Sequence, residues 1–389
     1  MEKIRIITDS AADLDNVRPE VTVIPMKISF GSETYLDGVN LSHREFYEKL
    51  VESDALPVTS LVSPGEFSDV FEKAAAAGEK MLVITISGDL SGTYQSALLA
   101  AEEYAGRIRV IDSRQATVGE QLVVNRALQL MDNGLGLDAI ADRLEAEKEE
   151  IHTIGLLDTL EYLKKGGRIS KTVAFVGGAL AIKPVVAIVD GKVILLGKAR
   201  GSKNGENFLM REAEKAGLDF SRPMCLGYTG FSDAMLQKYM EDSRHLWEGH
   251  EDSLPICTIG ATIGTHIGPI AIALSFFEKK LDFPKKCRKT PPERLFRRRS
   301  FGQLVLATHL SEAIAAVYGT IGLGLEGNLG LTAAAGTGSS EELTGTTGAV
   351  LASVTAGLAA LGLVLEATLC VEFLFTGGEN EFLAALFAN

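Results

Sequence analysis

Residues 81–97, MLVITISGDLSGTYQSA, contain the pattern that decides the fold. The apolar run 81–86 predicts a buried β-strand, and a helix is expected over 94–104. The turn between them, SGDLSGT, is rich in glycine and hydroxyl side chains. A helix that starts here offers unpaired backbone N–H groups and the positive end of its dipole. We therefore expect a strand–turn–helix unit suited to an anion such as a carboxylate or a phosphate.

The same alternation extends through the first 160 residues. Further strands are predicted at 3–8, 22–30, 108–112 and 151–157, and further helices at 64–77, 119–132 and 137–149. Strands that alternate with helices favour a parallel sheet whose faces are covered.

A second α/β region is expected after residue 160. The dipeptide Asp190-Gly191 separates the strand-like runs 184–190 and 193–198, which predicts a hairpin. Helices at 203–217 and 231–241 and strands at 224–228 and 255–259 complete this region. We predict an N-terminal parallel-sheet α/β domain over 1–160 and a smaller α/β domain over 161–280. The cleft between two domains is the expected place for a ligand.

The composition changes near the C-terminus. Residues 281–300 contain three prolines and a basic run, which predicts a linker. Residues 301–389 are an extension rich in Gly, Ala and Leu, and 343–365 has 23 residues without a charge, long enough to span a bilayer. A buried helix, or a tail without native structure, are the alternatives for this segment.

Composition excludes several classes of protein. The 389 residues are 46% hydrophobic and 23% charged, which is ordinary for a globular chain and unlike collagen or a disordered protein. The four cysteines are too few for a disulfide scaffold, and none are at metal-ligand spacing. The net charge of −13 argues against nucleic-acid binding. The start, MEKIRIITDS, predicts a strand rather than a signal peptide, so a cytoplasmic protein is expected.

Four positions stand out as candidates for chemistry, and each has a structural alternative. Ser91 is either an anion ligand or a helix cap. His266, in GTHIGP, is either a ligand or a buried structural group, and Arg168, after two glycines, either binds an anion or pairs with a surface carboxylate. Asp9-Ser10, at the end of the first strand, is either a cap or part of the cleft.

Taken together, seven segments resemble one family, the DegV family of bacterial fatty-acid-binding proteins. They are ITDSAADL (7–14), VTS with SPGEF (58–60 and 63–67), SGDLSGTYQSA (87–97), VIDSRQATVG (110–119), DTLEYLKKGGRISK (158–171), IKPVVAIVDGKV (182–193) and GTHIGPIAIAL (264–274). The resemblance covers residues 1–280, and GGRIS and LSGTYQSA are its most specific parts.

The resemblance implies a two-domain DegV-like fold with one long-chain fatty acid between the domains. The carboxylate-binding residues fall on Thr59, Ser91 with Gly92, and His266, and the family arginine falls on Arg168, near the emerging head group. It also implies a non-catalytic subunit without a cofactor, which presents the fatty acid to a separate ATP-binding fatty acid kinase subunit. The chain itself has no G-x-x-x-x-G-K-[ST] motif for phosphate binding.

The chain departs from the family pattern at two places, and two other functions stay open. Leu61-Val62-Ser63 replaces the usual Gln-Pro-Ser, and Ile267-Gly268-Pro269-Ile270 replaces Thr-Gly-Pro-Gly after the histidine. One alternative function is a serine hydrolase with Ser91 as nucleophile and His266 as base. The other is a lipid-binding adaptor tethered to a membrane through 343–365.

Overall fold

The computed structural model describes residues 2–53, 56–170, 182–251 and 254–279. They belong to the first of two units of the chain, Met1–Asp282, and the second unit, Phe283–Asn389, lies outside the described residues. The linker 281–300, the tail 301–389 and its segment 343–365 therefore stay predictions. In the described part of the chain, none of the helices combines the length and the apolar character needed to cross a membrane.

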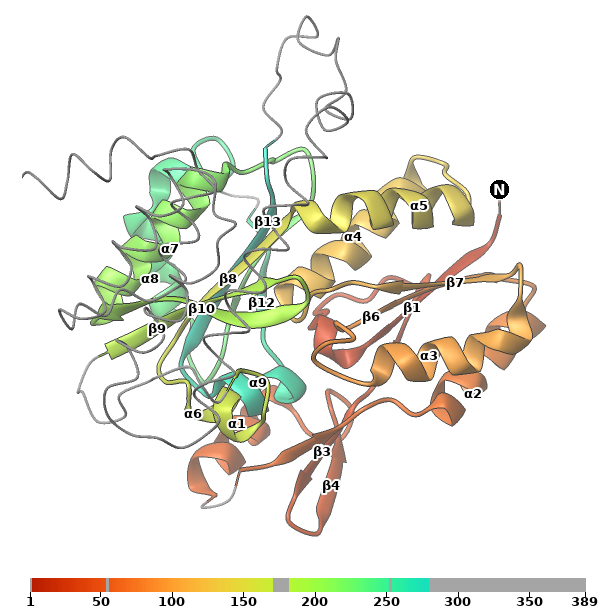
Figure 1. Cartoon of the computed structure of the whole chain (residues 1–389), viewed down its shortest axis with the longest axis horizontal. Helices are drawn as coiled ribbons and strands as arrows, with labels where there is room; N and C mark the ends of the chain where they lie inside the picture. The colour runs from red at the N-terminus through yellow and green to blue at the C-terminus, as the bar shows by residue number, and fades with distance from the viewer. Residues whose placement is uncertain (1, 54–55, 171–181, 252–253, 280–389) are drawn as a thin grey trace, which may run out of the picture. The chain divides into compact units, whose positions relative to one another are not determined.

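The first sheet is parallel, as the alternation of strands and helices predicts. Its order is β2-β1-β6-β7, with β1 (Ile4–Asp9), β2 (Val21–Ile24), β6 (Lys80–Thr85) and β7 (Ile108–Asp112). Two helices lie on each side of it (Figure 1): α2 (Pro64–Ala76) with α3 (Thr93–Ala101), and α4 (Val118–Asp132) with α5 (Leu137–Glu147). Because both faces are covered, the strands are apolar over most of their length, with the charged residues near their ends.

The second sheet is mostly antiparallel. Its order is β10-β9-β8-β13-β11-β12, with β8 (Ile151–Leu157), β9 (Ile182–Val189), β10 (Lys192–Arg200), β11 (Met224–Tyr228), β12 (Ile256–Thr258) and β13 (Ala271–Phe277). Only β11 and β12 pair in parallel among these strands. Helices α7 (Ser202–Ala216) and α8 (Ala234–Asp242) supply Leu209, Ala213, Leu236 and Tyr239 to the core on one face.

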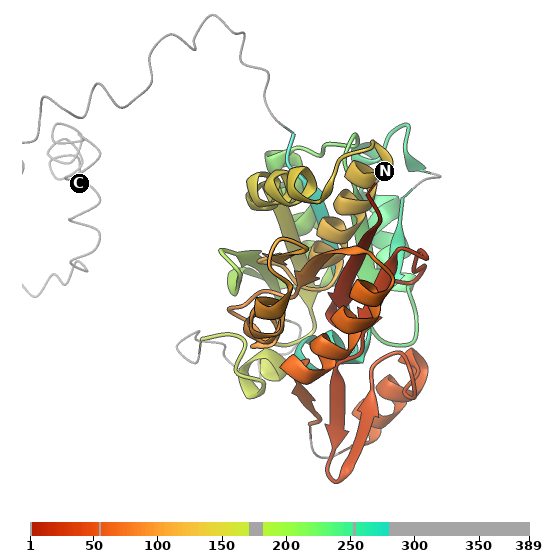
Figure 2. The same cartoon turned by 90° about the vertical axis from the view of Figure 1, so that its right-hand side faces the viewer.

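A small third sheet was not predicted. Its order is β4-β3-β5, with β3 (Lys27–Phe30), β4 (Glu33–Leu36) and β5 (Val58–Ser60), and it extends away from the first sheet beside α1 (His43–Glu52) (Figure 2). The run 22–30, predicted as one strand, is interrupted at Pro25-Met26. Proline has no N–H to donate to a sheet, and the chain moves there from the first sheet to the third.

The mixed α/β class and the hairpin are confirmed. β9 and β10 pair antiparallel around Asp190 and Gly191, whose φ angles of 49° and 78° suit a tight hairpin turn. The strand at 151–157 also exists, but its expected place in the parallel sheet was wrong, because β8 pairs antiparallel with β13 and β9. The domain limits 1–160 and 161–280 stay a prediction.

Helix α4 joins the two large sheets, and two glycines permit its close approach. It contacts β1 and β6 on one side and β11 and β13 on the other. A Cβ on Gly119 of α4 would lie 2.3 Å from Thr153 Oγ1 of β8, and a Cβ on Gly227 of β11 would lie 2.8 Å from a Val118 methyl. Larger side chains at these positions would separate the helix from the second sheet.

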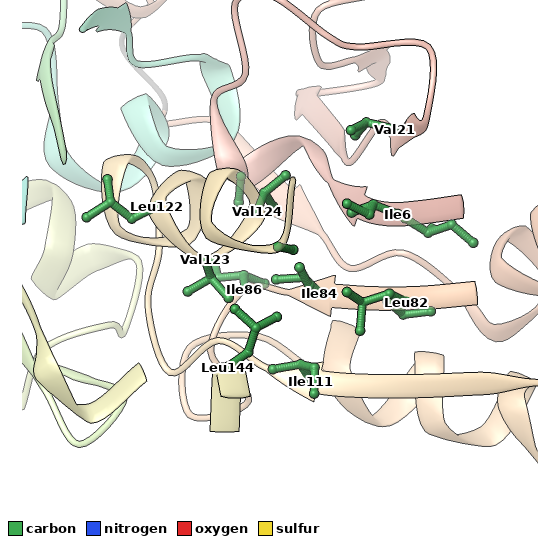
Figure 3. Packing of buried hydrophobic residues seen from close by; sticks show 14 of the residues in the cluster. Ile6, Val21, Leu82, Ile84, Ile86, Ile111, Leu122, Val123, Val124 and Leu144 are labelled. Carbon is green, nitrogen blue, oxygen red and sulfur yellow. The ribbon is translucent and has the colours of Figure 1, made fainter. Parts of the chain in front are cut away.

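The largest apolar cluster lies around α4 (Figure 3). Ile6, Leu82 and Ile84 of the first sheet pack with Leu122 and Val124 of α4, and all five are almost completely buried. Each such side chain contributes about 1.5–3 kcal/mol when it is fully removed from water. This cluster fixes α4 and the carboxyl ends of β1 and β6 relative to each other.

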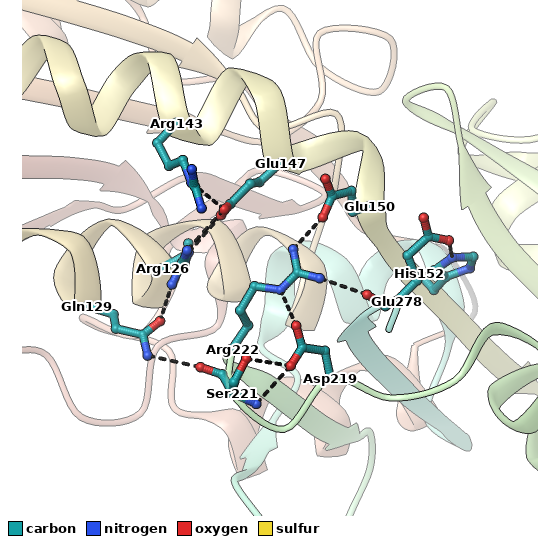
Figure 4. Close-up of polar contacts among 10 residues, drawn as sticks. All are labelled: Arg126, Gln129, Arg143, Glu147, Glu150, His152, Asp219, Ser221, Arg222 and Glu278. Carbon is teal, nitrogen blue, oxygen red and sulfur yellow. Dashed lines mark hydrogen bonds and ion pairs between the residues drawn. The ribbon is translucent and has the colours of Figure 1, made fainter. Parts of the chain in front are cut away.

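Buried ion pairs join α4 to α5 and hold the segment before β11 (Figure 4). Arg126 of α4 binds Glu147 of α5 through two N–H···O bonds of 2.7 and 3.0 Å. Arg222, before β11, pairs with Glu150 and Asp219 and donates to the Glu278 carbonyl. Bidentate guanidinium–carboxylate pairs of this kind set orientation as well as distance.

Glu120 has a buried carboxyl group, and we predict that it makes the free energy of unfolding depend on pH. Its Oε1 accepts from the Thr8 hydroxyl, Oε2 has no partner among the described residues, and burial followed by the nearby Asp9 raises its pKa well above 4.5. The stabilising contribution of such a group is present below pH 4.5 and is lost as pH rises through the folded-state pKa. We expect Glu120→Gln to raise the free energy of unfolding at pH 8 by about 1 kcal/mol or more.

Urea unfolding of the wild type and Glu120→Gln at pH 5 and pH 8 measures this effect. Glu72→Gln, at an exposed position of α2, is the matched control and should change neither value. A loss of stability at pH 8 in Glu120→Gln would contradict the prediction.

Candidate functional site

A cavity of about 380 Å³ is lined by residues of the second and third sheets, of α9 (Ala261–Ile267) and of the loops that follow β6 and β7 of the first sheet. Its volume lies in the usual range for small-molecule sites. Most of the lining is apolar: Met26, Leu61, Ile86, Leu90, Ala116, Ile154, Leu157, Leu163, Val186, Ala187, Ile188, Val193, Ile263, Ile267, Ile272 and Ala273. All five residues predicted for the site, Thr59, Ser91, Gly92, Arg168 and His266, lie on its wall.

Small residues on neighbouring strands hollow one wall of the cavity. Gly155 of β8 is paired with Ala273 of β13 on one side and with Val186 of β9 on the other. A Cβ on Gly155 would meet no atom nearer than 3.4 Å, so the glycine is not forced by packing within the sheet. Its missing side chain adds to the open volume instead.

Thr59 and His266 are hydrogen-bonded to each other where they line the cavity. Thr59 is in the short strand β5, opposite Ile28 of β3, and His266 is in the last turn of α9 (Ala261–Ile267). Thr59 Oγ1 and His266 Nε2 are 3.0 Å apart, a hydrogen bond between residues 207 positions apart in sequence. Gly166 allows the ring to sit here, since a Cβ at that position would lie 2.3 Å from His266 Nδ1.

Ser91 and Gly92 form the turn that starts α3. Ser91 Oγ accepts from the Thr93 backbone N–H at 3.3 Å and lies 2.9 Å from Thr93 Oγ1. Gly92 allows this turn to approach β5, because a Cβ there would lie 2.9 Å from a Leu61 methyl. Ser91 is therefore a turn residue at the helix start and also lines the cavity near Thr59, so the two interpretations of it are compatible.

Arg168 follows α6 (Glu161–Lys165) and also lines the cavity. Its Nε donates to the Leu90 carbonyl at 3.2 Å and its Nη1 to the Gly166 carbonyl at 2.6 Å. Within the described ranges no carboxylate pairs with it, so the alternative of a surface ion pair is not observed there. Its positive charge is held beside the Ser91 turn by backbone carbonyls.

Comparison with known proteins identifies relatives of this chain. The family model of the DegV proteins matches residues 3–279. The chain belongs to the DegV family. A DegV domain-containing protein of Caldanaerobacter subterraneus is 33% identical over 291 residues, covering 72% of this chain and 100% of the relative.

Solved DegV structures share the fold. A DegV family protein from Thermus thermophilus, described by its fatty acid binding, is 30% identical with a TM-score of 0.63, covering 71% of this chain and 99% of its own. The fatty acid kinase B3 protein of Streptococcus pneumoniae, solved with linoleic acid, is 25% identical with a TM-score of 0.63, covering 72% and 100%. Both of these DegV relatives are therefore fatty-acid-binding proteins.

The imidazole of His266 is neutral in this DegV protein. Burial, and then the nearby Arg168, lower its pKa from 6.5 to about 4. Nδ1 is buried and has no partner among the described residues. A proton on Nδ1 would be an unsatisfied donor, so the proton belongs on Nε2, which donates to Thr59 Oγ1. The Thr59 hydroxyl is then free to donate its own proton into the cavity.

The contacts of Ser91 and His266 differ from those of a serine hydrolase. In the described residues, Ser91 bonds within its own turn and His266 Nε2 bonds to Thr59. No carboxylate orients His266 Nδ1 there. The nucleophile–base–acid chain of such an enzyme is not assembled in this arrangement.

Asp9-Ser10, left open between a cap and the cleft, has a structural role in the turn after β1. Asp9 accepts from the backbone N–H groups of Ala11 and Ile86, each at 3.0 Å. Ser10 bonds to Asp37 and to the Met26 N–H. Asp9 thereby joins the carboxyl ends of β1 and β6, next to the cavity.

Several residues that shape the cavity could not be recognised from the sequence. Gly155 and Ala273 are unremarkable until the pairing of β8 with β13 brings them together. Thr117 lines the cavity with a φ of 50°, unusual for a β-branched residue, directly before α4. The motif VIDSRQATVG contains it but does not reveal this conformation.

The free energy of unfolding at acid pH should depend on the protonation of His266. The unfolded chain protonates His266 near pH 6.5, whereas the folded protein does so only near pH 4. The contribution of this group is therefore full above pH 6.5 and is lost as pH falls to about 4. In ligand-free protein, His266→Gln should reduce the loss of stability between pH 7 and pH 4.5 by up to about 2–3 kcal/mol. Urea unfolding at both pH values measures it, and equal losses in the two proteins would contradict the assignment.

Proposed function

We propose that this DegV protein binds one long-chain fatty acid, with its acyl chain in the cavity and its carboxylate at Thr59, Ser91 and His266. The observation that supports this most is the chemistry of the lining. Apolar side chains make up most of the wall, which also carries the hydroxyls of Thr59 and Ser91 and a neutral imidazole that is hydrogen-bonded to Thr59. A ligand that matches this lining is long, apolar and has a single hydrogen-bonding group at one end.

The carboxylate would be held by neutral donors. His266 Nε2–H donates to Thr59 Oγ1, and Thr59 O–H then donates to the ligand. Thr93 O–H can donate to Ser91 Oγ in the same way, which leaves Ser91 O–H for a second ligand bond. A buried carboxylate without donors is costly, and these charge-assisted bonds, together with the positive end of α3, offset that cost.

The apolar wall supplies most of the affinity. Each methylene group removed from water contributes about 0.8 kcal/mol. The wall includes residues of β8, β9, β10 and β13 as well as turns of the first sheet, so an acyl chain would be covered from several sides. Affinity should therefore depend on how the chain fits this volume.

The proposal also includes a role as a non-catalytic subunit in the cytoplasm, presenting its fatty acid to a separate ATP-binding kinase subunit. Two observations support it. A solved relative is described as a fatty acid kinase B3 protein, and this chain lacks a P-loop motif. Arg168, beside the Ser91 turn, would pair with the phosphate of the acyl phosphate formed by the kinase.

Ser91→Ala tests the carboxylate site. Loss of one donor to a buried anion costs about 1–3 kcal/mol, so the Kd for palmitate should rise about 5- to 150-fold. The measurement is fluorescence displacement or calorimetry with delipidated full-length protein. Native mass spectrometry of the protein as purified should show the mass of a long-chain fatty acid.

Ser29→Ala is the control, because its hydroxyl bonds to Thr34 in the third sheet, away from the cavity lining. Its Kd should match that of the wild type. The proposal would be contradicted if the purified protein carried no fatty acid and the delipidated protein bound none of the fatty acid added to it. Hydrolysis of p-nitrophenyl esters that Ser91→Ala abolishes would favour the hydrolase alternative instead.

Gly155→Val tests the position of the acyl chain. The nearest atom to a Cβ at 155 is the Ile272 carbonyl oxygen at 3.4 Å, so the strand accepts a side chain whose methyl groups then occupy the cavity beside Val186 and Leu157. We expect the Kd for palmitate to rise at least about tenfold, as expected for overpacking of a fitted volume, while octanoate binding changes much less. Gly155→Ala should give a smaller effect in the same direction. An unchanged Kd for palmitate would show that the acyl chain lies elsewhere.

A further inference from the structure

Three carboxylates from the N-terminal part of the chain hold the segment that leads into α9. Asp15 accepts from the Thr258 N–H and hydroxyl, and Asp13 accepts from the Gly260 N–H at 2.8 Å. Asp37 accepts from the backbone N–H groups of Ala261 and Thr262 at 3.1 and 3.0 Å. Of the three, only Asp37 binds residues of α9 itself.

Asp37 is almost completely buried, and its carboxylate is saturated with donors. Besides the two backbone N–H groups, it accepts from the Thr262 hydroxyl and from Ser10 Oγ at 3.1 Å. Its relative exposure is 7%. A carboxylate at the first turn of a helix satisfies N–H groups that have no partner within the helix and faces the positive end of the helix dipole.

The third sheet holds α9 at both ends. Asp37 directly follows β4, and Thr59 is in β5, the strand on the other side of β3. Lys27 of β3 is opposite Leu36 of β4 and also opposite Ser60 of β5, so the residues next to Asp37 and Thr59 share one row of the sheet. Asp37 binds the first turn of α9, and Thr59 binds His266 in its last turn, about 6 Å further along the axis.

The body of α9 is also closely packed. A Cβ on Gly264 would lie 2.5 Å from the Tyr47 hydroxyl and 2.6 Å from the Phe46 ring, both in α1. The helix therefore has little freedom to shift while its first turn is held. If that turn is released, its short length leaves few other bonds to keep the last turn in place.

We propose that Asp37 is a positioning residue that fixes α9 so that His266 meets Thr59 at the carboxylate site. Asp37 is not among the residues that line the cavity. It acts through the helix, and the third sheet sets the distance between the two contacts. The effect on ligand affinity rests on the proposed function, whereas the effect on His266 does not.

The test uses delipidated full-length protein and three variants. Asp37→Asn replaces an acceptor oxygen with an amide N–H₂ facing helix N–H groups. Thr262→Val removes the hydroxyl bonds to Asp37 and to Ser10 and keeps the backbone bonds. Because Thr262 also lines the cavity, this variant tests the inference through the pKa of His266. Asp15→Asn is the matched control. Exposed Asp15 binds the same segment at Thr258, which lies at the end of β12 and before α9.

The readouts are the pKa of His266, from NMR titration of its ring protons assigned with His266→Gln, and the Kd for palmitate. In Asp37→Asn we expect the pKa of His266 to rise from about 4 toward 6.5, because the ring leaves its buried position beside Arg168. The Kd should rise about tenfold or more. Thr262→Val should shift the pKa of His266 in the same direction by less, and Asp15→Asn should shift neither the pKa nor the Kd.

The outcomes separate the two proposals. If Asp37→Asn and Thr262→Val lower the unfolding midpoint but leave the pKa of His266 and the Kd unchanged, Asp37 only holds the chain together and the inference is wrong. If Asp37→Asn does not fold, an unchanged pKa of His266 in Thr262→Val overturns the inference instead. If the wild type binds no fatty acid, the proposed function fails, and the titration of His266 still decides the role of Asp37.

Discussion

The hydrogen bond between Thr59 and His266 is the contact on which the site depends. It joins a short strand of the third sheet to a short helix that follows the second sheet, across 207 positions of sequence. Burial keeps the imidazole neutral, and a neutral ring with one buried, unpartnered nitrogen has only one sensible place for its proton. The direction of the bond follows, and it leaves a threonine hydroxyl pointing its proton to the cavity. The polar chemistry of the site is thus fixed by an apolar environment.

The distance between the two large sheets is the second constraint. Gly119 of α4 lies against Thr153 of β8, which lines the cavity and donates to Gln115 at 2.8 Å. The same helix buries its other side against β1 and β6, whose carboxyl ends lead into the Asp9 and Ser91 turns. One buried helix therefore positions both walls of the cavity. This is the usual place for a ligand in an open parallel sheet, beyond the carboxyl ends of its strands.

The sequence pattern predicts those elements whose structure is determined by residues close together in the chain. The run 81–86, the turn at Ser91 and the hairpin at Asp190-Gly191 are specified by residues close in sequence, and each was found as expected. The choice of partner strand is not local, so the strand 151–157 was recognised but assigned to the wrong sheet. The third sheet was missed because its strands span only three or four residues each, too short for a periodic signal. Residue type and spacing alone marked Ser91, Arg168 and His266 as candidates but left each of them ambiguous. Family resemblance gave these residues a role and added Thr59 and Gly92.

The departures from the family pattern have a physical consequence at the same site. Leu61 and Ile267, where the family usually has glutamine and threonine, both line the cavity. They are close in sequence to Thr59 and His266, which with Ser91 form the polar cluster of the site. Leu61 also packs on Gly92, so an apolar side chain lies between the Thr59 strand and the Ser91 turn. Apolar neighbours lower the local dielectric, which strengthens each remaining hydrogen bond and raises the penalty for any donor left unpaired. A cluster with fewer polar groups depends more strongly on the geometry of those that remain, and here that geometry is set by α9 and the strand that carries Thr59.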